Sequence, residues 1–163
     1  MRHGLAEDRE EFAKKNQDDS LRPLTMKGRK RTQKVAMQLR DWLEEVDLIV
    51  SSPFTRARQT AELVSQIFIE TKVVEAPELV PSSPPTAFKR WLRAHGEGHK
   101  RILVVGHEPQ LSILASYFMS GQEESLLELK KSGTLCLKIE NFKTVAPGTA
   151  KLMWLLQPRH IVD

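Results

Sequence analysis

The sequence of 163 residues lacks several features that define special classes of protein. Its single cysteine, Cys136, cannot form an intramolecular disulfide or a cysteine-based zinc site, so we expect a protein of the reducing cytoplasm. No apolar run approaches the roughly 18 residues of a membrane helix, and the first residues lack the apolar run of a secretory signal. These absences exclude disulfide scaffolds and zinc fingers, and they predict no membrane partner.

What is present is an ordinary globular composition. Apolar residues make up 40% of the chain and charged residues 28%. This balance is typical of a folded soluble protein, and the length suits one substantial core. We therefore predict a single domain over residues 1–163, with a monomer as the default.

The net charge of +4 raises the possibility of nucleic-acid binding. The densest basic run comprises Lys27, Arg29, Lys30, Arg31 and Lys34. Apolar residues at helical spacing follow between residues 35 and 43, so most of these cations lie on the opposite, solvated face. No aromatic residue interleaves the run to stack bases, so we expect no nucleic-acid partner. A solvated outer face is the expectation, and docking of an acidic or phosphorylated partner is the alternative.

Strand and helix patterns alternate along the chain. Short apolar runs predict strands at 48–50, 72–75, 101–106, 135–139 and 152–156. Helices are predicted from Pro53 to near Glu70, from Thr86 to about Ala94, and from after His107-Glu108-Pro109 to about Met119. This alternation predicts an α/β fold, a three-layer αβα sandwich with a mainly parallel central sheet.

Three short motifs should meet at the carboxyl ends of the strands, where open α/β sheets bind ligands. Arg2-His3-Gly4 opens the chain, Arg56 and Arg58 lie in the first turns of a helix, and His107 ends a strand. Arginine binds phosphate oxygens bidentately, and a metal-free histidine inside such a site can attack phosphorus. A cation at a helix start opposes the helix dipole unless an anion lies between them. The combination predicts a phosphate site, although each motif alone also has a plain structural explanation.

The sequence resembles the histidine phosphatase superfamily, whose fold is phosphoglycerate mutase-like, and within it the short phosphohistidine phosphatases of the SixA type. The matching segments are Arg2-His3-Gly4-Leu5-Ala6-Glu7, Pro23-Leu24-Thr25-Met26-Lys27-Gly28, Ser51-Ser52-Pro53-Phe54-Thr55-Arg56-Ala57-Arg58-Gln59-Thr60-Ala61 and Val105-Gly106-His107-Glu108-Pro109. Their order and approximate spacing agree from residue 2 to about residue 115. The chain length suits the compact branch that lacks large cap insertions.

The resemblance implies a role for each matching residue. His3 is expected to be the nucleophile that becomes a phosphohistidine, and Arg2, Arg56 and His107 to hold the phosphoryl oxygens. Glu78, after the predicted strand at 72–75, matches the segment after the family's third strand, where many members carry a general acid; a loop-capping carboxylate is the alternative. No metal or cofactor is expected, because the arginines supply the positive charge.

Several other residues have more than one interpretation. Glu7, Thr25 and Glu108 could support the site, although Thr25 is expected to cap the helix that carries the basic run. The segment Lys130-Lys131-Ser132-Gly133 could line the rim of the pocket, but a solvated turn is the expectation. His95 and His99 have metal-ligand spacing, but the glycines between them disfavour a rigid metal site.

One departure from the family concerns the first sheet strand. Members usually begin with a short apolar strand that leads into the RHG motif, whereas only Met1 precedes Arg2 here. The strand is expected to be central, so its absence should leave its neighbours unpaired and His3 poorly positioned. An upstream start, another segment in the gap, or a weakened relative would each explain the pattern.

The predicted function is a metal-independent phosphatase acting on phosphohistidine in a signalling or phosphotransfer protein. A small-molecule phosphomonoesterase that depends on Glu78 is the first alternative. A module that binds phosphorylated partners without hydrolysis is the second.

Overall fold

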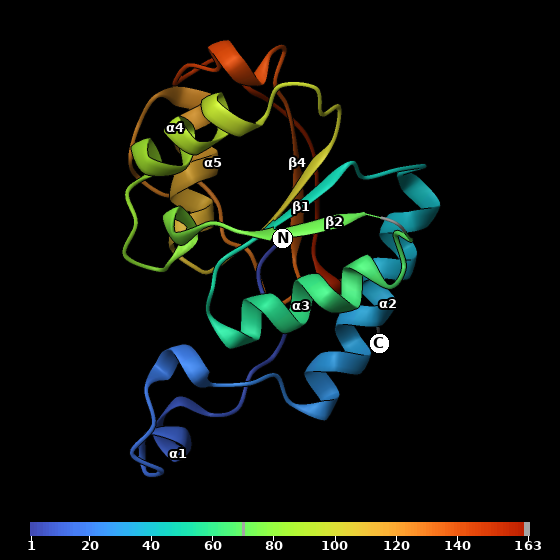
Figure 1. Cartoon of the computed structure of the whole chain (residues 1–163), viewed down its shortest axis with the longest axis vertical. Coiled ribbons are helices and arrows are strands. Elements are labelled where there is room, and N and C mark those ends of the chain that lie inside the picture. Colours follow the sequence, from blue (N-terminus) through green and yellow to red (C-terminus); the bar gives the residue numbers. More distant parts are fainter. Residues whose placement is uncertain (70, 162–163) are drawn as a thin grey trace.

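A parallel three-stranded sheet lies at the centre of the protein, as seen in the computed structural model, which describes residues 1–69 and 71–161 (Figure 1). The strand order is β2 (Lys72–Glu75), β1 (Leu48–Ser51), β3 (Ile102–Val105). Ile49 of β1 is in register with Val73 and Leu103 on its two sides. All four residues of β1 are buried, as expected for the middle strand of a covered parallel sheet.

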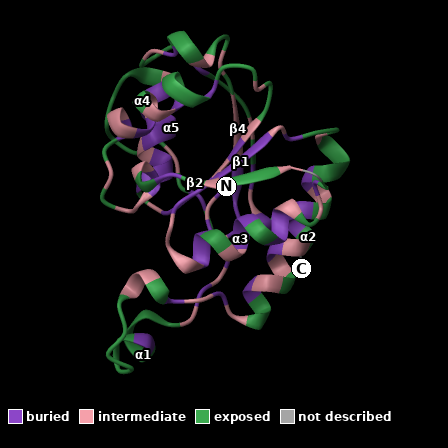
Figure 2. Ribbon diagram, viewed as in Figure 1, coloured by how far each residue is buried: buried purple, intermediate pink, exposed green. Residues whose placement is uncertain are grey.

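Helices cover both faces of this sheet (Figures 1 and 2). Helices α2 (Met26–Trp42) and α3 (Thr55–Ser65) pack on one face, and α4 (Pro85–His95) and α5 (Gln110–Ser120) on the other. Because side chains alternate along a strand, Ile49 belongs to the first core and Val50 to the second. The predicted three-layer αβα arrangement is confirmed.

The basic run lies on the outer face of α2, as predicted. Lys27, Lys30 and Lys34 are exposed, whereas Val35 and Leu39 are buried against the sheet. None of the helices within the described ranges is long and apolar enough to cross a membrane.

The C-terminal strands differ from the mainly parallel prediction. β4 (Thr134–Lys138) and β5 (Lys151–Leu156) form a separate antiparallel pair with an irregularity between Cys136 and Leu137. Helix α3 also ends at Ser65, earlier than the predicted end near Glu70, a residue outside the described ranges. Alternating apolar residues indicate a strand but not its direction, which explains the first difference.

Short helical turns connect these elements. They are α1 (Arg9–Ala13), η1 (Asp19–Leu21), η2 (Pro77–Leu79), η3 (Phe142–Thr144) and η4 (Pro158–His160). Figure 1 shows that the segment with α1 and η1 projects beyond the N-terminal end of α2, away from α4 and α5.

The first three residues lie beside β3. The Met1 amino group donates to the carbonyl of Val104 at 2.7 Å, and the His3 N–H donates to that of Gly106 at 3.0 Å. On the other side, the Arg2 N–H donates to the Gly133 carbonyl at 2.8 Å. The expectation that His3 is poorly positioned is therefore wrong, because a segment of three residues is bonded on both sides.

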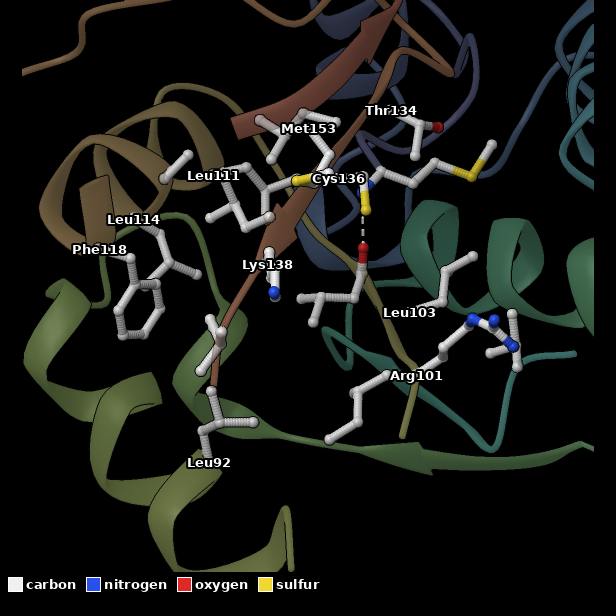
Figure 3. A pocket seen from close by; sticks show the side chains of 18 of the residues that line it. Leu92, Arg101, Leu103, Leu111, Leu114, Phe118, Thr134, Cys136, Lys138 and Met153 are labelled. Atoms are coloured by element: carbon white, nitrogen blue, oxygen red, sulfur yellow. Dashed lines mark hydrogen bonds between the residues drawn. The ribbon is translucent and has the colours of Figure 1, made fainter. Parts of the chain in front are cut away.

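On the side of Met1 away from His3, however, no strand within the described ranges connects β3 and β4 by hydrogen bonds. A cavity of about 670 Å³ lies between them, lined by Leu103, Leu111, Leu114 and Cys136 among others (Figure 3). Burial lowers the pKa of the Met1 amino group, at the edge of this cavity, from 8.0 to about 5. This cavity lies behind the RHG motif rather than at it.

Candidate active site

His3 is held in one tautomer at the centre of the site. Its side chain is buried, and Nδ1 lies 2.7 Å from the carbonyl oxygen of Gly4. A carbonyl can only accept, so Nδ1 carries the proton and Nε2 keeps its lone pair. Burial, together with the nearby ring of His107, lowers the pKa of His3 from 6.5 to about 2. The imidazole is therefore neutral at physiological pH, as a nucleophile must be.

Close packing around the next residues fixes this position. The Gly4 N–H donates to Thr60 Oγ1 of α3 at 3.0 Å, and a Cβ on Gly4 would lie 2.4 Å from Thr32 Oγ1. A Cβ on Gly28 would lie only 2.0 Å from the carbonyl oxygen of Leu5. Both glycines are thus required for the segment after His3 to lie directly on α2.

His107 ends β3 beside His3. The two ring centroids are 5.1 Å apart, and Nε2 of His107 lies 2.8 Å from the hydroxyl of Ser52, which follows β1. Burial and, secondarily, the charge of Arg56 lower the pKa of His107 from 6.5 to about 3. Adjacent parallel strands thus bring Ser52 and His107 to the same edge, as the strand order requires.

Arg56 enters from the first turn of α3 and is almost fully buried. Its guanidinium forms an ion pair with the Asp19 carboxylate at 3.0 Å and donates to the Asp19 carbonyl at 2.8 Å. Arg22 Nε donates to the same carboxylate at 2.8 Å, and the ring of Phe54 lies 5.0 Å from the Arg56 guanidinium carbon. Sequence reasoning missed Asp19 and Arg22. Their spacing of three residues just before the Pro23-Leu24-Thr25 motif was the available signal.

Arg2 completes a set of inward-facing donors. Its terminal nitrogen donates to the Leu129 carbonyl at 2.8 Å, and burial lowers its pKa. Nε of Arg2, Nε of Arg56 and Nδ1 of His107 are buried and have no hydrogen-bond partner among the described residues. Buried polar atoms without partners are rare in folded proteins and are typical of functional sites. The site can therefore offer several positively charged or neutral donors to an oxyanion.

The remaining candidates lie at varying distances from this centre. Arg58 forms an exposed ion pair with Glu75 and takes no part in the donor set. Thr25 caps α2 through the Gly28 N–H at 2.9 Å, as predicted. Glu108 accepts from the Ser112 hydroxyl at 2.6 Å at the start of α5, and Glu7 pairs with an exposed lysine.

Glu78 lies in η2, directly after β2. One of its carboxylate oxygens is buried and accepts no hydrogen bond from the described residues, and no side chain caps η2. The structure thus provides no capping contact for the carboxylate within the described ranges.

The turn at residues 130–133 contacts the segment of Arg2 and His3, so the expectation of a solvated turn is wrong. The Ser132 N–H donates to the His3 carbonyl at 3.2 Å, and its hydroxyl lies 3.0 Å from Thr32 Oγ1. Ser132 is fully buried with φ of 64°, a left-handed conformation that is uncommon for a residue with a side chain. Lys131 is half-buried beside it.

Comparisons with known proteins agree with this geometry. A model of the histidine phosphatase superfamily (branch 1) matches residues 1–80. Phosphohistidine phosphatase SixA of Escherichia coli (strain K12) is 32% identical over 124 residues, covering 75% of this chain and 73% of that protein. An uncharacterized protein of Picosynechococcus sp. is 33% identical over 163 residues, covering 99% and 96% of the two chains.

Among solved structures, the protein histidine phosphatase SixA in complex with tungstate has a similar fold. The TM-score is 0.82 at 27% sequence identity, with 98% of this chain and 96% of that chain covered. The chain is therefore similar to these relatives in sequence and to the solved structure in fold.

Proposed function

The chain belongs to the histidine phosphatase superfamily, and from this premise we propose that it is a phosphatase that hydrolyses phosphohistidine in a protein, with His3 as its nucleophile. The observation that carries the proposal is the tautomer of His3. Its Nδ1 proton is bonded to the Gly4 carbonyl, which leaves the Nε2 lone pair available among the cationic side chains. A SixA relative named for this activity supports the choice of substrate.

The reaction has two steps. Nε2 of His3 attacks phosphorus, the bond from phosphorus to the substrate imidazole breaks, and that imidazole takes a proton from solvent as it leaves. Water then attacks the phosphorus, the bond to Nε2 breaks, and inorganic phosphate leaves with His3 neutral again. Both steps transfer a phosphoryl group whose charge is spread over its oxygens, so fixed cations stabilise them.

Arg2, Arg56 and His107 would hold the phosphoryl group. Both arginines have a buried Nε available as a donor, and Nδ1 of His107 is a buried ring nitrogen without a partner among the described residues. Asp19 keeps the Arg56 guanidinium fixed before substrate arrives, since it bonds through both its carboxylate and its carbonyl. The permanent charge of the arginines supplies the electrostatic role that magnesium has in other phosphoryl-transfer enzymes, so we propose a metal-independent reaction.

Trapping of an acid-labile phosphoenzyme tests the proposal. The wild-type chain, mixed with a phosphohistidine protein, should form a labelled intermediate that is stable to alkali and lost in acid. His3→Ala should form none and should lose turnover by at least about a thousandfold. His95→Gln, which changes an exposed histidine on α4, is the matched control and should behave as wild type. Absence of an intermediate together with tight binding of the phosphoprotein would instead identify a binding module.

A phosphomonoesterase of small molecules is the second candidate, and the unpartnered buried oxygen of Glu78 favours it. An alkoxide leaving group needs a proton donor, which a carboxylic acid can provide, whereas imidazole leaves more readily. Under this alternative, Glu78→Gln should slow hydrolysis of alkyl phosphate esters by about a hundredfold or more. Under our proposal, the wild-type chain should turn over phosphohistidine protein far faster than such esters, and Glu78→Gln should have little effect on that rate.

A further inference from the structure

Lys131 occupies an unusual position, because it belongs to a turn that is fixed to the main chain of the nucleophile. The Ser132 N–H donates to the His3 carbonyl at 3.2 Å, and the Gly133 carbonyl accepts from the Arg2 N–H at 2.8 Å. The left-handed, fully buried Ser132 holds the turn in one conformation. The main chain of the turn that carries Lys131 is therefore bonded directly to the main chain of Arg2 and His3.

The ammonium of Lys131 has no hydrogen bond or ion pair with any side chain within the described ranges, although it is half-buried. The neighbouring Lys130 differs, since its exposed ammonium lies 2.6 Å from the Glu128 carboxylate. A partly desolvated ammonium without an anionic partner is costly, so an anion from outside the chain would stabilise it.

The groups that face Lys131 are themselves cationic or neutral. Burial and, in decreasing order, the charges of Arg2, Arg22, Arg56 and Arg9 together lower the pKa of Lys131 from 10.5 to about 8. The charge of Lys131 in turn contributes to the low pKa of His3. Four elements thus direct positive charge to one region: the N-terminal segment, the segment with α1 and η1, the start of α3 and the turn at 130–133.

We propose that Lys131 is a further substrate-binding residue, whose ammonium contacts oxygens of the phosphoryl group beside the pocket of Arg2, His3, Arg56 and His107. The inference deepens the proposed function and rests on it for the identity of the anion. The protonated ammonium adds a mobile point charge to the planar, fixed arginines, and it can follow the phosphoryl oxygens as phosphorus moves toward Nε2 of His3.

Binding of inorganic phosphate tests the contact separately from turnover. Calorimetry at pH 7 should show that Lys131→Met weakens phosphate binding on the order of tenfold, since a charge-assisted hydrogen bond is lost. Lys131→Arg should recover most of the affinity. Lys130→Met, the matched control, should bind phosphate within about twofold of wild type.

The pH dependence gives a second readout that a structural role would not change. Wild-type affinity should fall as the pH rises above about 8, because free Lys131 loses its proton there. His3 and His107 titrate far lower and the arginines remain charged, so these groups stay constant over this range. Bound phosphate should raise the pKa of Lys131, and Lys131→Met should abolish the fall.

The outcomes separate the two proposals. Unchanged phosphate affinity and an unchanged pH profile in Lys131→Met would overturn the role of Lys131, even if the phosphoenzyme forms. Conversely, a Lys131-dependent phosphate site in a chain that never forms a phosphoenzyme would overturn the proposed function and leave this inference standing. Turnover of a phosphohistidine protein should show the same tenfold loss in kcat/KM for Lys131→Met.

Discussion

An apolar extension ahead of Met1 should stabilise the protein, because the cavity between β3 and β4 has the position of a sheet strand. The chain direction at residues 1–3 is parallel to β3, and the Met1 amino group already donates to Val104 within that ladder. Four added residues, Val-Ile-Val-Leu, would span about 13 Å at 3.3 Å per residue, the length of the four-residue β3. Their side chains would alternate between the two cores.

Two contributions determine the size of the effect. Replacing the buried amine by an amide removes a group whose pKa falls from 8.0 to about 5 on folding. At pH 7 the unfolded chain carries this proton and the folded chain does not, so folding costs about 1.4 kcal/mol that the amide avoids. Each buried apolar side chain adds about 1.5–3 kcal/mol, offset by about 1–2 kcal/mol of backbone entropy. The total is about 2–5 kcal/mol, or a rise in Tm on the order of 10 °C.

Thermal and urea unfolding at pH 7 measure this effect. A Gly-Ser-Gly-Ser extension is the matched control, since it replaces the buried amine by an amide but adds no apolar side chains. It should stabilise by at most about 1.4 kcal/mol, well below the apolar extension. Equal stability of the two extended chains would refute the assignment of the cavity as a strand position.

The same amine gives the unextended chain a pH-dependent stability. Folding lowers the pKa of the Met1 amine, so the free energy of unfolding decreases as the pH falls from 8 toward about 5. Above pH 8 the amine is neutral in both states, and the folded state has its full stability. Because the amine is fully buried, the slope should disappear in either extended chain. A slope that persists after extension would assign it to other groups.

Three further changes test the packing that supports the site. Gly28→Ala should destabilise by more than about 2 kcal/mol in urea unfolding and reduce turnover, because its Cβ would lie 2.0 Å from the Leu5 carbonyl oxygen. Ser52→Ala should leave the buried Nε2 of His107 without its partner at 2.8 Å, lowering kcat/KM by about tenfold and stability by about 1–3 kcal/mol; an unchanged rate would contradict this. Phe68→Ala should cost about 3–5 kcal/mol, since the ring is almost fully buried, while the phosphate affinity of the folded fraction stays constant.

The sequence predicted the strands well, because short apolar runs bounded by turn residues have few other interpretations. The segments of β1, β2 and β3 were placed within a residue or two, and the parallel order then brought Ser52 and His107 to one edge. The direction of β4 and β5 was not predictable, since an alternating pattern fits either a parallel or an antiparallel neighbour.

The parts of the site that escaped prediction lie in irregular segments. Asp19 acts through a carboxylate and a carbonyl on a short 3₁₀ turn, and no periodicity marks such a turn. Ser132 adopts a left-handed conformation for which glycine or asparagine would be the usual signal, so the sequence does not indicate this buried turn. In both cases a long-range contact with the RHG or α3 segment determines the local conformation.

These irregular segments also explain how His3 is placed with so little sheet beside it. The strand position behind Met1 is a cavity, yet the main chain of His3 is bonded both to Gly106 and to Ser132. The next residue is bonded to Thr60 of α3. Positioning of His3 therefore depends on the turn and the helix as well as on β3. It follows that the apolar extension should raise stability much more than it raises kcat, and a large rise in kcat would show that the strand position itself controls the nucleophile.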